Sequence, residues 1–378
     1  MRRVSKKIQD QLSGTAWVDE YFLKTKKIVE SHGDAHVTYA IFMRRPVLSA
    51  PRLAINWLKE KELERNTQFQ IDLCYPEGAW VGAGEPLMYV SGQFSQLVDL
   101  ETELLMKIGP ACVAAYNAFS MCSTLPKIPF LAMDARHCAG HDMAEQMSYA
   151  ASVGSASAKE KAKAIGFIGN SIAATSHYFG NEKAMGTMPH ALIGYAGSTL
   201  KAAELYAKTF PDQSLIVLID YFAQEITDSL EVCYHFSAEA KSGKLSLRID
   251  TSGGRYVEGL DPTQSYAVLE KHSPKSIRGF RTEDELKHLV GTGVSAAGLF
   301  WLRENLDKNG FEQVKIIASS GFDYNKCLLM AEAKAPIDMI GTGSFLPEKW
   351  RETYATADII DYDGKPRVKV GREFLFRK

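Results

Sequence analysis

Residues 184–192 read AMGTMPHAL. The stretch is short, apolar and interrupted by glycine, and His190 stands where a buried strand would give way to a loop. The last polar residue of such a strand points into a site, and a histidine there can carry a proton or act as a nucleophile near neutral pH. The alternative is a structural histidine that is hydrogen-bonded into the rim of a barrel. We predict a strand over 184–190 that presents His190 at a site.

Six further apolar runs end on polar or glycine residues in the same way. They are Ile128–Asp134, Ala164–Asn170, Ser214–Asp220, Leu245–Asp250, Gln313–Ser319 and Ile337–Gly343. Helical patterns lie between most of these runs, and alternation of apolar strands with helices is typical of a parallel sheet buried on both faces. Seven such units within residues 125–345 favour a closed or nearly closed barrel over an open doubly wound sheet. No G-x-G-x-x-G follows a first strand, which argues against a dinucleotide-binding domain.

The expected fold class is therefore α/β, with a (β/α) barrel-like parallel core. Residues 36–43 (HVTYAIFM) alternate nearly as a strand does, and residues 94–119 have a long helical pattern. We expect a smaller N-terminal α+β domain with a helical linker over residues 1–124 and the barrel over 125–345. The C-terminal extension, 346–378, contains short β-like segments that we expect to pack on the N-terminal domain and complete it.

Composition excludes several classes of function. The 378 residues are 46% hydrophobic and 24% charged with a net charge of −1, which gives no basis for a nucleic-acid partner or an acidic membrane partner. The six cysteines form no CxxC pair, which argues against a zinc knuckle or a disulfide framework and fits a reducing compartment. The sequence has no apolar run of about 18 residues, and its basic N-terminus lacks the apolar core of a signal peptide. We expect a cytoplasmic protein without a membrane partner.

Polar residues and glycines gather at the expected strand ends, where reactive groups of α/β barrels lie. They are Asp134, Arg136, His137, Asn170, Ser171, His190, Asp220, Arg248, Asp250, Thr251, Ser319, Ser320, Gly321, Asp323, Gly341, Thr342 and Gly343. The arginines and the two late glycine-containing ends favour anions, because free backbone amides there can cradle phosphate. The carboxylates favour Mg²⁺ or sugar hydroxyls, so a phosphorylated sugar with a divalent ion fits both halves. The alternative is that Arg136 and Arg248 form rim salt bridges with Asp134 and Asp250.

Eight short motifs follow one another along the chain. They are Asp19-Glu20-Tyr21-Phe22, Pro76-Glu77-Gly78 with Glu85-Pro86-Leu87, Asp134-Ala135-Arg136-His137, GTMPH at 186–190, LIDYF at 218–222, LRIDTSGG at 247–254, SSGFD at 319–323 and GTGSFL at 341–346. In this order they resemble the nicotinate phosphoribosyltransferase family, the type II phosphoribosyltransferases of NAD salvage. Each motif alone is weak, but the ordered set covers roughly residues 15–345 and is specific.

The resemblance implies an enzyme that joins nicotinate to 5-phosphoribosyl 1-pyrophosphate and yields nicotinate mononucleotide and pyrophosphate. It implies Mg²⁺ as cofactor and ATP as co-substrate, with ATP hydrolysis proceeding through a phosphohistidine at His190. The catalytic residues would be His190, Asp220 and Asp250, with Asp220 near the Mg-pyrophosphate. The substrate-binding residues would be Tyr21, Arg136, Ser171 and Arg248, and the phosphate-binding residues Ser320, Gly321, Gly341, Thr342 and Gly343. No residue is assigned as a metal ligand. Tyr21 would stack on the pyridine ring from the partner subunit, so a homodimer with a shared site is expected.

Departures from the family pattern concern the base that is bound. Met133 or Leu131 stands where the family has a second stacking aromatic, and His137 stands where it often has a second arginine. The alternatives are a nicotinamide or quinolinate phosphoribosyltransferase and a non-catalytic phosphosugar-binding relative. Nicotinamide would need an acidic group at the second strand end, which offers Asn170 and Ser171. Quinolinate, with two carboxylates, would need a denser basic cluster than the strand ends offer. A further alternative is an unrelated phosphosugar barrel enzyme such as an aldolase, which would need a lysine at a strand end, and none of the seven runs ends on one.

Overall fold

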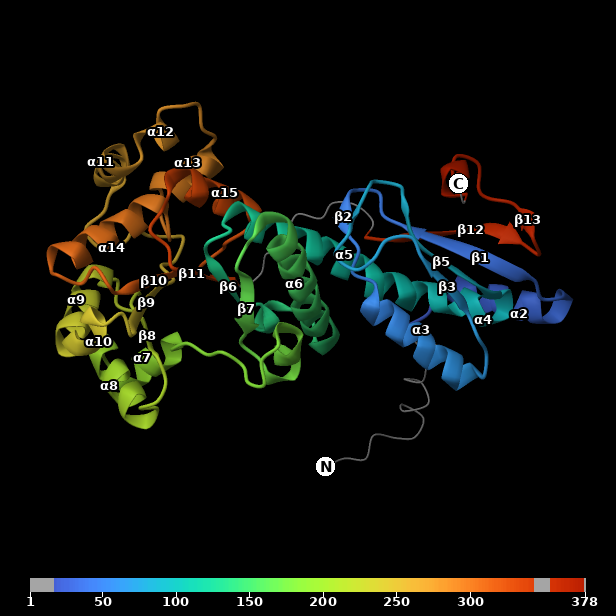
Figure 1. Ribbon diagram of the computed structural model, residues 1–378, viewed down its shortest axis with the longest axis horizontal. Helices are drawn as coiled ribbons and strands as arrows, with labels where there is room; N and C mark the ends of the chain where they lie inside the picture. Colours follow the sequence, from blue (N-terminus) through green and yellow to red (C-terminus); the bar gives the residue numbers. More distant parts are fainter. Residues whose placement is uncertain (1–16, 343–353, 377–378) are drawn as a thin grey trace. The chain divides into compact units, whose positions relative to one another are not determined.

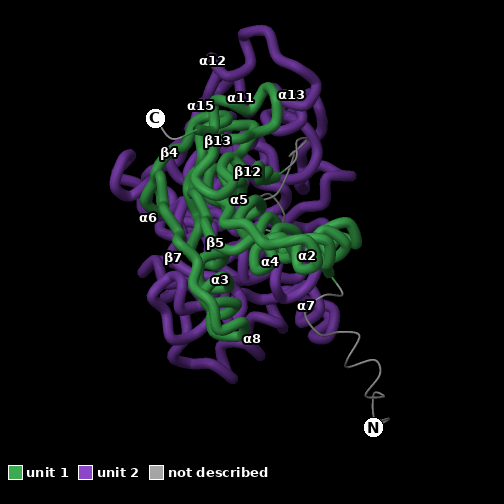
Figure 2. Tube along the Cα trace, turned by 90° about the vertical axis from the view of Figure 1, so that its right-hand side faces the viewer, with its two compact units in different colours: residues 1–116, 349–378 green, residues 117–348 purple. Residues whose placement is uncertain are grey.

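The computed structural model describes residues 17–342 and 354–376. It divides the chain into two compact units, Met1–Tyr116 with Lys349–Lys378, and Asn117–Glu348 (Figure 2). The boundary lies inside a long helix, α5 (Glu101–Thr124), which contains Pro110. Gly343, one of the expected phosphate-binding residues, lies outside the described residues.

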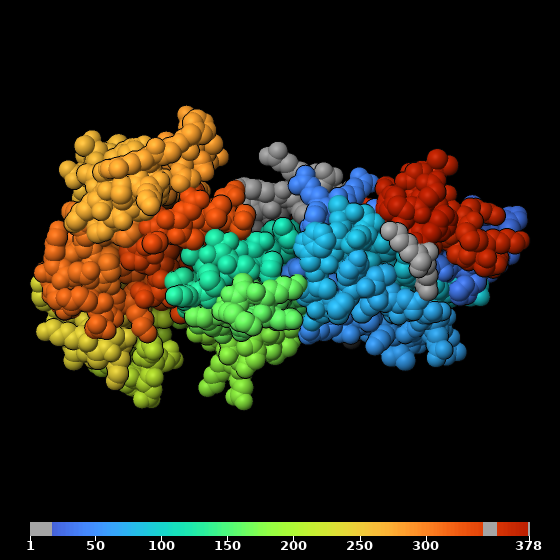
Figure 3. Space-filling model, turned by 45° about the horizontal axis from the view of Figure 1, so that its top comes forward, coloured from blue at the N-terminus to red at the C-terminus, as the bar shows by residue number. Residues whose placement is uncertain are grey.

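The first unit is built on a five-stranded antiparallel sheet in the order β13-β12-β1-β5-β3. Its strands are β1 (His36–Phe42), β3 (Gln70–Leu73), β5 (Pro86–Gln93), β12 (Thr356–Tyr362) and β13 (Lys365–Pro366), and β2 (Val47–Leu48) pairs with β4 (Trp80–Val81). The tail strand β12 runs antiparallel to β1, and Figure 3 shows the red tail against blue segments of the same unit. Side chains of three of these strands and of the tail form a buried cluster around Phe42, Tyr89, Ile360 and Leu375.

Helices flank this sheet. They are α2 (Glu20–His32), α3 (Arg52–Arg65), α4 (Phe94–Leu97) and the first part of α5, with short 3-10 turns η1 (Val98–Leu100) and η4 (Glu373–Leu375). Asp99, in η1, is 3% exposed and accepts hydrogen bonds from Arg65 at 2.7 and 2.9 Å and from Lys26 at 2.9 Å. This buried carboxylate therefore ties α2 and α3 to the segment that leads into α5.

The second unit is organised around a six-stranded parallel sheet in the order β7-β6-β11-β10-β9-β8 (Figure 1). The strands are β6 (Pro129–Ala132), β7 (Gly166–Asn170), β8 (Leu215–Leu218), β9 (Leu245–Ile249), β10 (Lys315–Ala318) and β11 (Met339–Thr342). Every neighbouring pair is parallel, and most strand residues are buried because helices cover the sheet. The expected α/β class with a parallel core is confirmed, and six of the seven predicted runs are strands.

The prediction of a strand over 184–190 is wrong. Residues 181–189 form no strand, and His190 is instead the first residue of helix α7 (His190–Ala196). The segment keeps one backbone bond to the preceding strand, from the Met185 amide to the Asn170 carbonyl at 2.8 Å. Gly186 and Pro189 disfavour a regular ladder, because glycine adds backbone freedom and proline lacks an amide donor. Among the described residues β7 and β8 therefore do not pair, and the sheet is not closed there.

The helices between the strands follow the expected alternation. They are α6 (His141–Ala162), α8 (Thr199–Thr209), α9 (Glu225–His235), α10 (Ser237–Lys241), α11 (Pro262–His272), α12 (Pro274–Ile277), α13 (Glu283–Val290), α14 (Ala296–Lys308) and α15 (Tyr324–Ala333), with 3-10 turns η2 (Ala135–His137) and η3 (Ala173–Phe179). Several begin at side-chain caps, such as Ser198 on α8 and Asp323 on α15. In the described part of the chain, no helix combines the length and apolarity needed to cross a bilayer.

Candidate functional site

The candidate site lies where β8, β9 and β10 end side by side. The chain leaves these strands through Asp220, Asp250 and Ser319. Because the strands are parallel neighbours, their carboxyl ends meet at one edge of the sheet. Asp220 is 7% exposed and Ser319 is 4% exposed, so polar side chains are buried at this edge and require partners.

Arg248 on β9 connects these ends. Its guanidinium donates from Nε to Ser319 Oγ at 3.1 Å, from Nη1 to Thr187 Oγ1 at 2.6 Å and from Nη2 to Asp250 Oδ2 at 2.8 Å. The residue is 5% exposed, and two of its five N–H donors remain after these bonds. Arg248 therefore holds the GTMPH segment against the ends of β9 and β10. The salt bridge between Arg248 and Asp250, given above as the alternative for this pair, is present.

His190 pairs with Asp220. Its Nε2 lies 3.0 Å from Asp220 Oδ2 and 3.2 Å from Oδ1, so one ring nitrogen faces the carboxylate and Nδ1 does not. The histidine side chain is 41% exposed and the aspartate 7%, which leaves the ring accessible to a ligand. Burial raises the pKa of Asp220, and the charge of Asp250 raises it further, while the contact with His190 opposes that rise.

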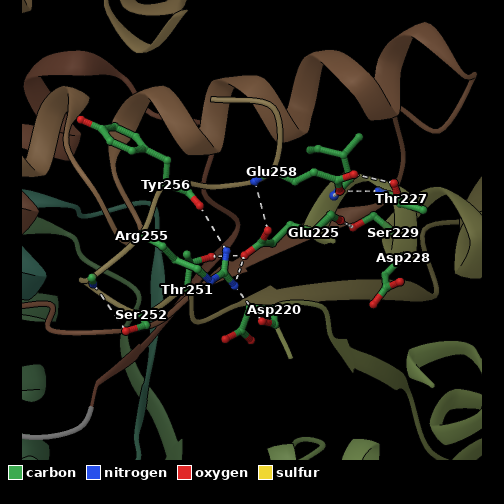
Figure 4. Close-up of polar contacts among 12 residues, drawn as sticks. Asp220, Glu225, Thr227, Asp228, Ser229, Thr251, Ser252, Arg255, Tyr256 and Glu258 are labelled. Carbon is green, nitrogen blue, oxygen red and sulfur yellow. Dashed lines mark hydrogen bonds and ion pairs between the residues drawn. The ribbon is translucent and has the colours of Figure 1, made fainter. Parts of the chain in front are cut away.

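A second cation, Arg255, holds the backbone of Asp220. Its Nη2 donates to the Asp220 carbonyl oxygen at 2.8 Å and pairs with Glu225 Oε1 at 2.6 Å (Figure 4). Glu225 is fully buried, and it also accepts hydrogen bonds from the Thr251 hydroxyl at 2.8 Å and the Glu258 amide at 3.1 Å. One buried carboxylate thus links α9, the end of β9 and the loop that carries Arg255.

The turn after β10 has an uncommon backbone. Ser320 and Gly321 both have positive φ, +77° and +64°, and a non-glycine residue in this region is strained. The Ser320 carbonyl oxygen accepts a hydrogen bond from Lys326 Nζ at 2.7 Å. Asp323 caps α15 by accepting from the Lys326 amide, also at 2.7 Å. The turn expected to bind phosphate is therefore held from behind by the helix that follows it.

The ends of β6, β7 and β11 bring together the other expected residues. Asp134 is 5% exposed, and burial raises its pKa to about 6. Arg136 is exposed, and its Nε donates to His137 Nε2 at 3.2 Å. The alternative Arg136–Asp134 ion pair does not form within the described ranges. Ser171 is exposed and donates its amide to the Ala132 carbonyl at 3.0 Å.

Gly341 and Thr342 are the last residues of β11. A Cβ on Gly341 would lie 2.8 Å from Met133 Sδ, so glycine allows the methionine to lie across the strand end. Thr342 accepts the Met133 amide on its carbonyl at 2.7 Å and donates its hydroxyl to the Leu131 carbonyl at 3.3 Å. Met133 therefore packs against the end of β11.

Tyr21 lies in the first unit, on α2, and is 60% exposed. Its ring packs against that of Phe22, with ring centroids 4.5 Å apart. The position is compatible with contact to another molecule, and it stays a prediction that this molecule is the pyridine substrate.

Four residues that sequence reasoning did not single out contribute to this edge. Thr187 stands inside the GTMPH motif, three residues before the histidine. Glu225 and Arg255 look like ordinary helix and loop charges, and Lys326 looks like one charge of an amphipathic helix. Their burial or their partners come from distant segments, and the local sequence gives no signal for that.

Comparisons with known proteins support the fold. The structure of a nicotinate-nucleotide pyrophosphorylase from Pyrococcus furiosus matches with a TM-score of 0.70 and 23% identity, over 98% of this chain and 81% of that one. The human nicotinic acid phosphoribosyltransferase matches with a TM-score of 0.60 and 15% identity, over 94% of this chain and 76% of that one. The chain has a phosphoribosyltransferase fold.

A curated relative carries the name that the motifs suggested. The chain is 25% identical over 316 residues to the nicotinate phosphoribosyltransferase pncB2 of Mycobacterium tuberculosis, covering 80% of this chain and 56% of the relative. It therefore spans about half the length of the curated relatives it matches. No family model matches the chain. The resemblance to nicotinate phosphoribosyltransferases is confirmed at the level of this homologue.

Proposed function

We propose that the chain is a nicotinate phosphoribosyltransferase that joins nicotinate to 5-phosphoribosyl 1-pyrophosphate. In this reaction the pyridine nitrogen forms a bond to C1′ of the ribose. The bond from C1′ to the pyrophosphate oxygen breaks, and pyrophosphate leaves with the electron pair. The observation that carries the proposal is the pairing of His190 with Asp220 beside the Arg248–Asp250 pair, at the adjacent ends of β8 and β9.

The chemistry needs positioning and charge stabilisation more than a strong base. Displacement at an anomeric carbon develops positive charge on the sugar and negative charge on the leaving group. Asp250, which is held by Arg248, would accept hydrogen bonds from ribose hydroxyls. The backbone amides at Ser320 and Gly321 would face the 5′-phosphate. Arg136 and Ser171 are exposed donors that suit a carboxylate on the ring, which favours nicotinate over nicotinamide.

Mg²⁺ fits this site as a companion of pyrophosphate. Mg²⁺ is commonly bound by one or two carboxylates together with substrate phosphates. Within the described ranges no group of three His, Cys, Asp or Glu side chains forms a metal site, so the protein alone would not hold it. Asp220 is the carboxylate that would face the ion, which would neutralise charge on the departing pyrophosphate.

ATP coupling is part of the proposal. Asp220 engages Nε2 of His190, which leaves Nδ1 as the nitrogen that would receive a phosphoryl group from ATP. Asp220 would then hold the ring in place while the Nδ1–phosphorus bond forms and the bond to the β-phosphate oxygen of ATP breaks, releasing ADP. The phosphohistidine would favour a closed, substrate-binding state, and its later hydrolysis would couple the consumption of ATP to nucleotide synthesis.

The test of the reaction is direct. Purified protein is incubated with phosphoribosyl pyrophosphate, Mg²⁺ and nicotinate, nicotinamide or quinolinate in turn, with and without ATP, and mononucleotides are separated by chromatography. We expect nicotinate mononucleotide, formed faster with ATP. Product from nicotinamide or quinolinate alone would change the substrate assignment, and no product from any base would overturn the enzyme proposal.

The shared site is tested by mixing two inactive variants. If Tyr21 reaches the partner's site, Tyr21→Ala and Arg136→Ala are each defective, yet their heterodimer contains one site with both native side chains. We expect activity to return when the two are refolded together, and a single dimeric species in light scattering. Absence of recovery, in a sample shown to contain heterodimer, would contradict the shared site.

A further inference from the structure

A buried lysine lies behind the turn that follows β10. Lys326, in the first turn of α15, is 4% exposed and belongs to none of the sequence motifs. Its Nζ donates to the Ser320 carbonyl oxygen at 2.7 Å and lies 4.5 Å from the centre of the Phe322 ring. Burying an ammonium is costly unless it is paired. Within the described part of the chain no carboxylate lies within ion-pair distance of Lys326, so its hydrogen-bond partner is the turn itself.

The contact fixes the direction of one backbone amide. In a trans peptide the carbonyl of one residue and the N–H of the next point in opposite directions. Lys326 holds the Ser320 carbonyl on its own side, so the Gly321 N–H points to the other side of the turn. Among residues 17–342 and 354–376, the amides of Ser320, Gly321 and Phe322 have no hydrogen-bond acceptor. Adjacent amides left free in a turn form a concavity that accepts anions.

We propose that Lys326 is a positioning residue for a phosphate monoester bound by the Ser320–Phe322 turn. Its hydrogen bond keeps the strained Ser320 backbone in the form that presents the amides, and its ammonium supplies positive charge behind the anion. The inference rests on the proposed function, because the monoester would be the 5′-phosphate of the phosphoribosyl substrate. Lys326 does not touch the phosphate and acts through the backbone.

The surroundings set the protonation state of this lysine. The charged and titratable groups around it are Asp323 and Cys327 on α15, Asp250 at the end of β9, and Lys287 and His288 on α13. Burial lowers the pKa of Lys326 to about 8, and the charge of Lys287 also lowers it. Cys327, Asp323 and Asp250 act in the opposite direction and raise this pKa. The ammonium therefore predominates at pH 7 and is lost as the pH rises through 8.

The test measures binding of ribose 5-phosphate to the full chain by calorimetry, and KM and kcat for phosphoribosyl pyrophosphate. The variants are Lys326→Met, which keeps length and removes charge, and Lys326→Arg, which keeps charge at all pH values. Lys287→Met is the matched control, because it removes an exposed charge from the neighbouring helix α13. At pH 7 we expect Lys326→Met to raise the Kd and KM by about 10- to 100-fold, with a much smaller change in kcat.

The pH profile separates positioning from a merely structural role. In the native chain the Kd should rise about tenfold between pH 7 and pH 9, and in Lys326→Arg this rise should be absent. If Lys326→Met folds with native Kd and KM, the inference is wrong and the proposed function stands. If Lys326→Met does not fold, the comparison of the native chain with Lys326→Arg decides. The inference is wrong if the Kd depends on pH in the same way in both proteins. If the native chain binds neither ribose 5-phosphate nor phosphoribosyl pyrophosphate, the proposed function itself fails.

Discussion

Glu225→Gln should destabilise the second unit strongly. Glu225 is fully buried, and its two oxygens serve Arg255, the Thr251 hydroxyl and the Glu258 amide. A glutamine keeps the shape but loses the charge, and its amide nitrogen cannot accept a hydrogen bond. Removing one partner of a buried ion pair costs about 3–5 kcal/mol, and the 31% exposure of Arg255 places this pair near the lower value.

A loss of about 3 kcal/mol lowers Tm by roughly 6–12 °C in a unit of this size. The measurement is thermal unfolding by circular dichroism and calorimetry at pH 7, with Glu312→Gln as an exposed control of the same chemistry. The double variant Glu225→Gln/Arg255→Met should cost about 1–3 kcal/mol less than the sum of the single variants, because the orphaned guanidinium is gone. A shift of under 2 °C for Glu225→Gln, or full additivity, would refute the reasoning.

Three further outcomes are expected. The pKa of Asp134 is about 6 in the folded state against 3.8 in the unfolded state, so protonation of this carboxyl stabilises the fold below pH 4, and that stability is lost as the pH rises through 6. The variant Asp134→Asn should therefore be more stable than the native chain by up to about 3 kcal/mol at pH 8 and by little at pH 4, as measured by urea unfolding. Arg248→Lys should lower kcat/KM by about 10- to 100-fold, because one ammonium cannot span the three acceptors of the guanidinium. His190→Ala should abolish stimulation by ATP and leave slow synthesis.

Each of these has a contrary result. Equal stabilisation by Asp134→Asn at pH 4 and pH 8 would mean that its carboxyl is not the titrating group. Native kinetics in Arg248→Lys would mean that the three contacts are not needed together. ATP stimulation that survives in His190→Ala would remove the phosphohistidine from the mechanism.

The sequence predicts the strands of the parallel core well, but it wrongly predicts a strand over 184–190. SLIVLID has five consecutive aliphatic residues and LSLRID alternates apolar with polar residues, and both patterns are typical of strands. AMGTMPH is also largely apolar, but Gly186 and Pro189 weaken ladder pairing, and the segment touches the strand ends without forming a strand. Hydrophobicity alone does not separate the two cases, because an apolar segment can be buried without being paired.

The candidate site was predictable where residues act through their own strand end. Asp220, Arg248 and Asp250 follow from the position of each run, and the structure brings them together. Glu225, Arg255 and Lys326 depend on contacts across 6 to 35 residues of chain, and their charges look solvent-exposed in sequence. Burial of a charge is a property of the assembled fold, so local patterns do not reveal it.

The segment 181–189 between β7 and β8 also allows ligand binding to be followed by hydrogen exchange. Among the described residues of 181–189, only Asn181 and Met185 donate a backbone hydrogen bond. Amides without such protection exchange with solvent on a short timescale, while those of the central strands exchange only through larger openings. Thr187 and His190 lie at the candidate site. Hydrogen-exchange mass spectrometry of this one peptide would therefore register occupancy of the site, without an attached probe and before any turnover is measured.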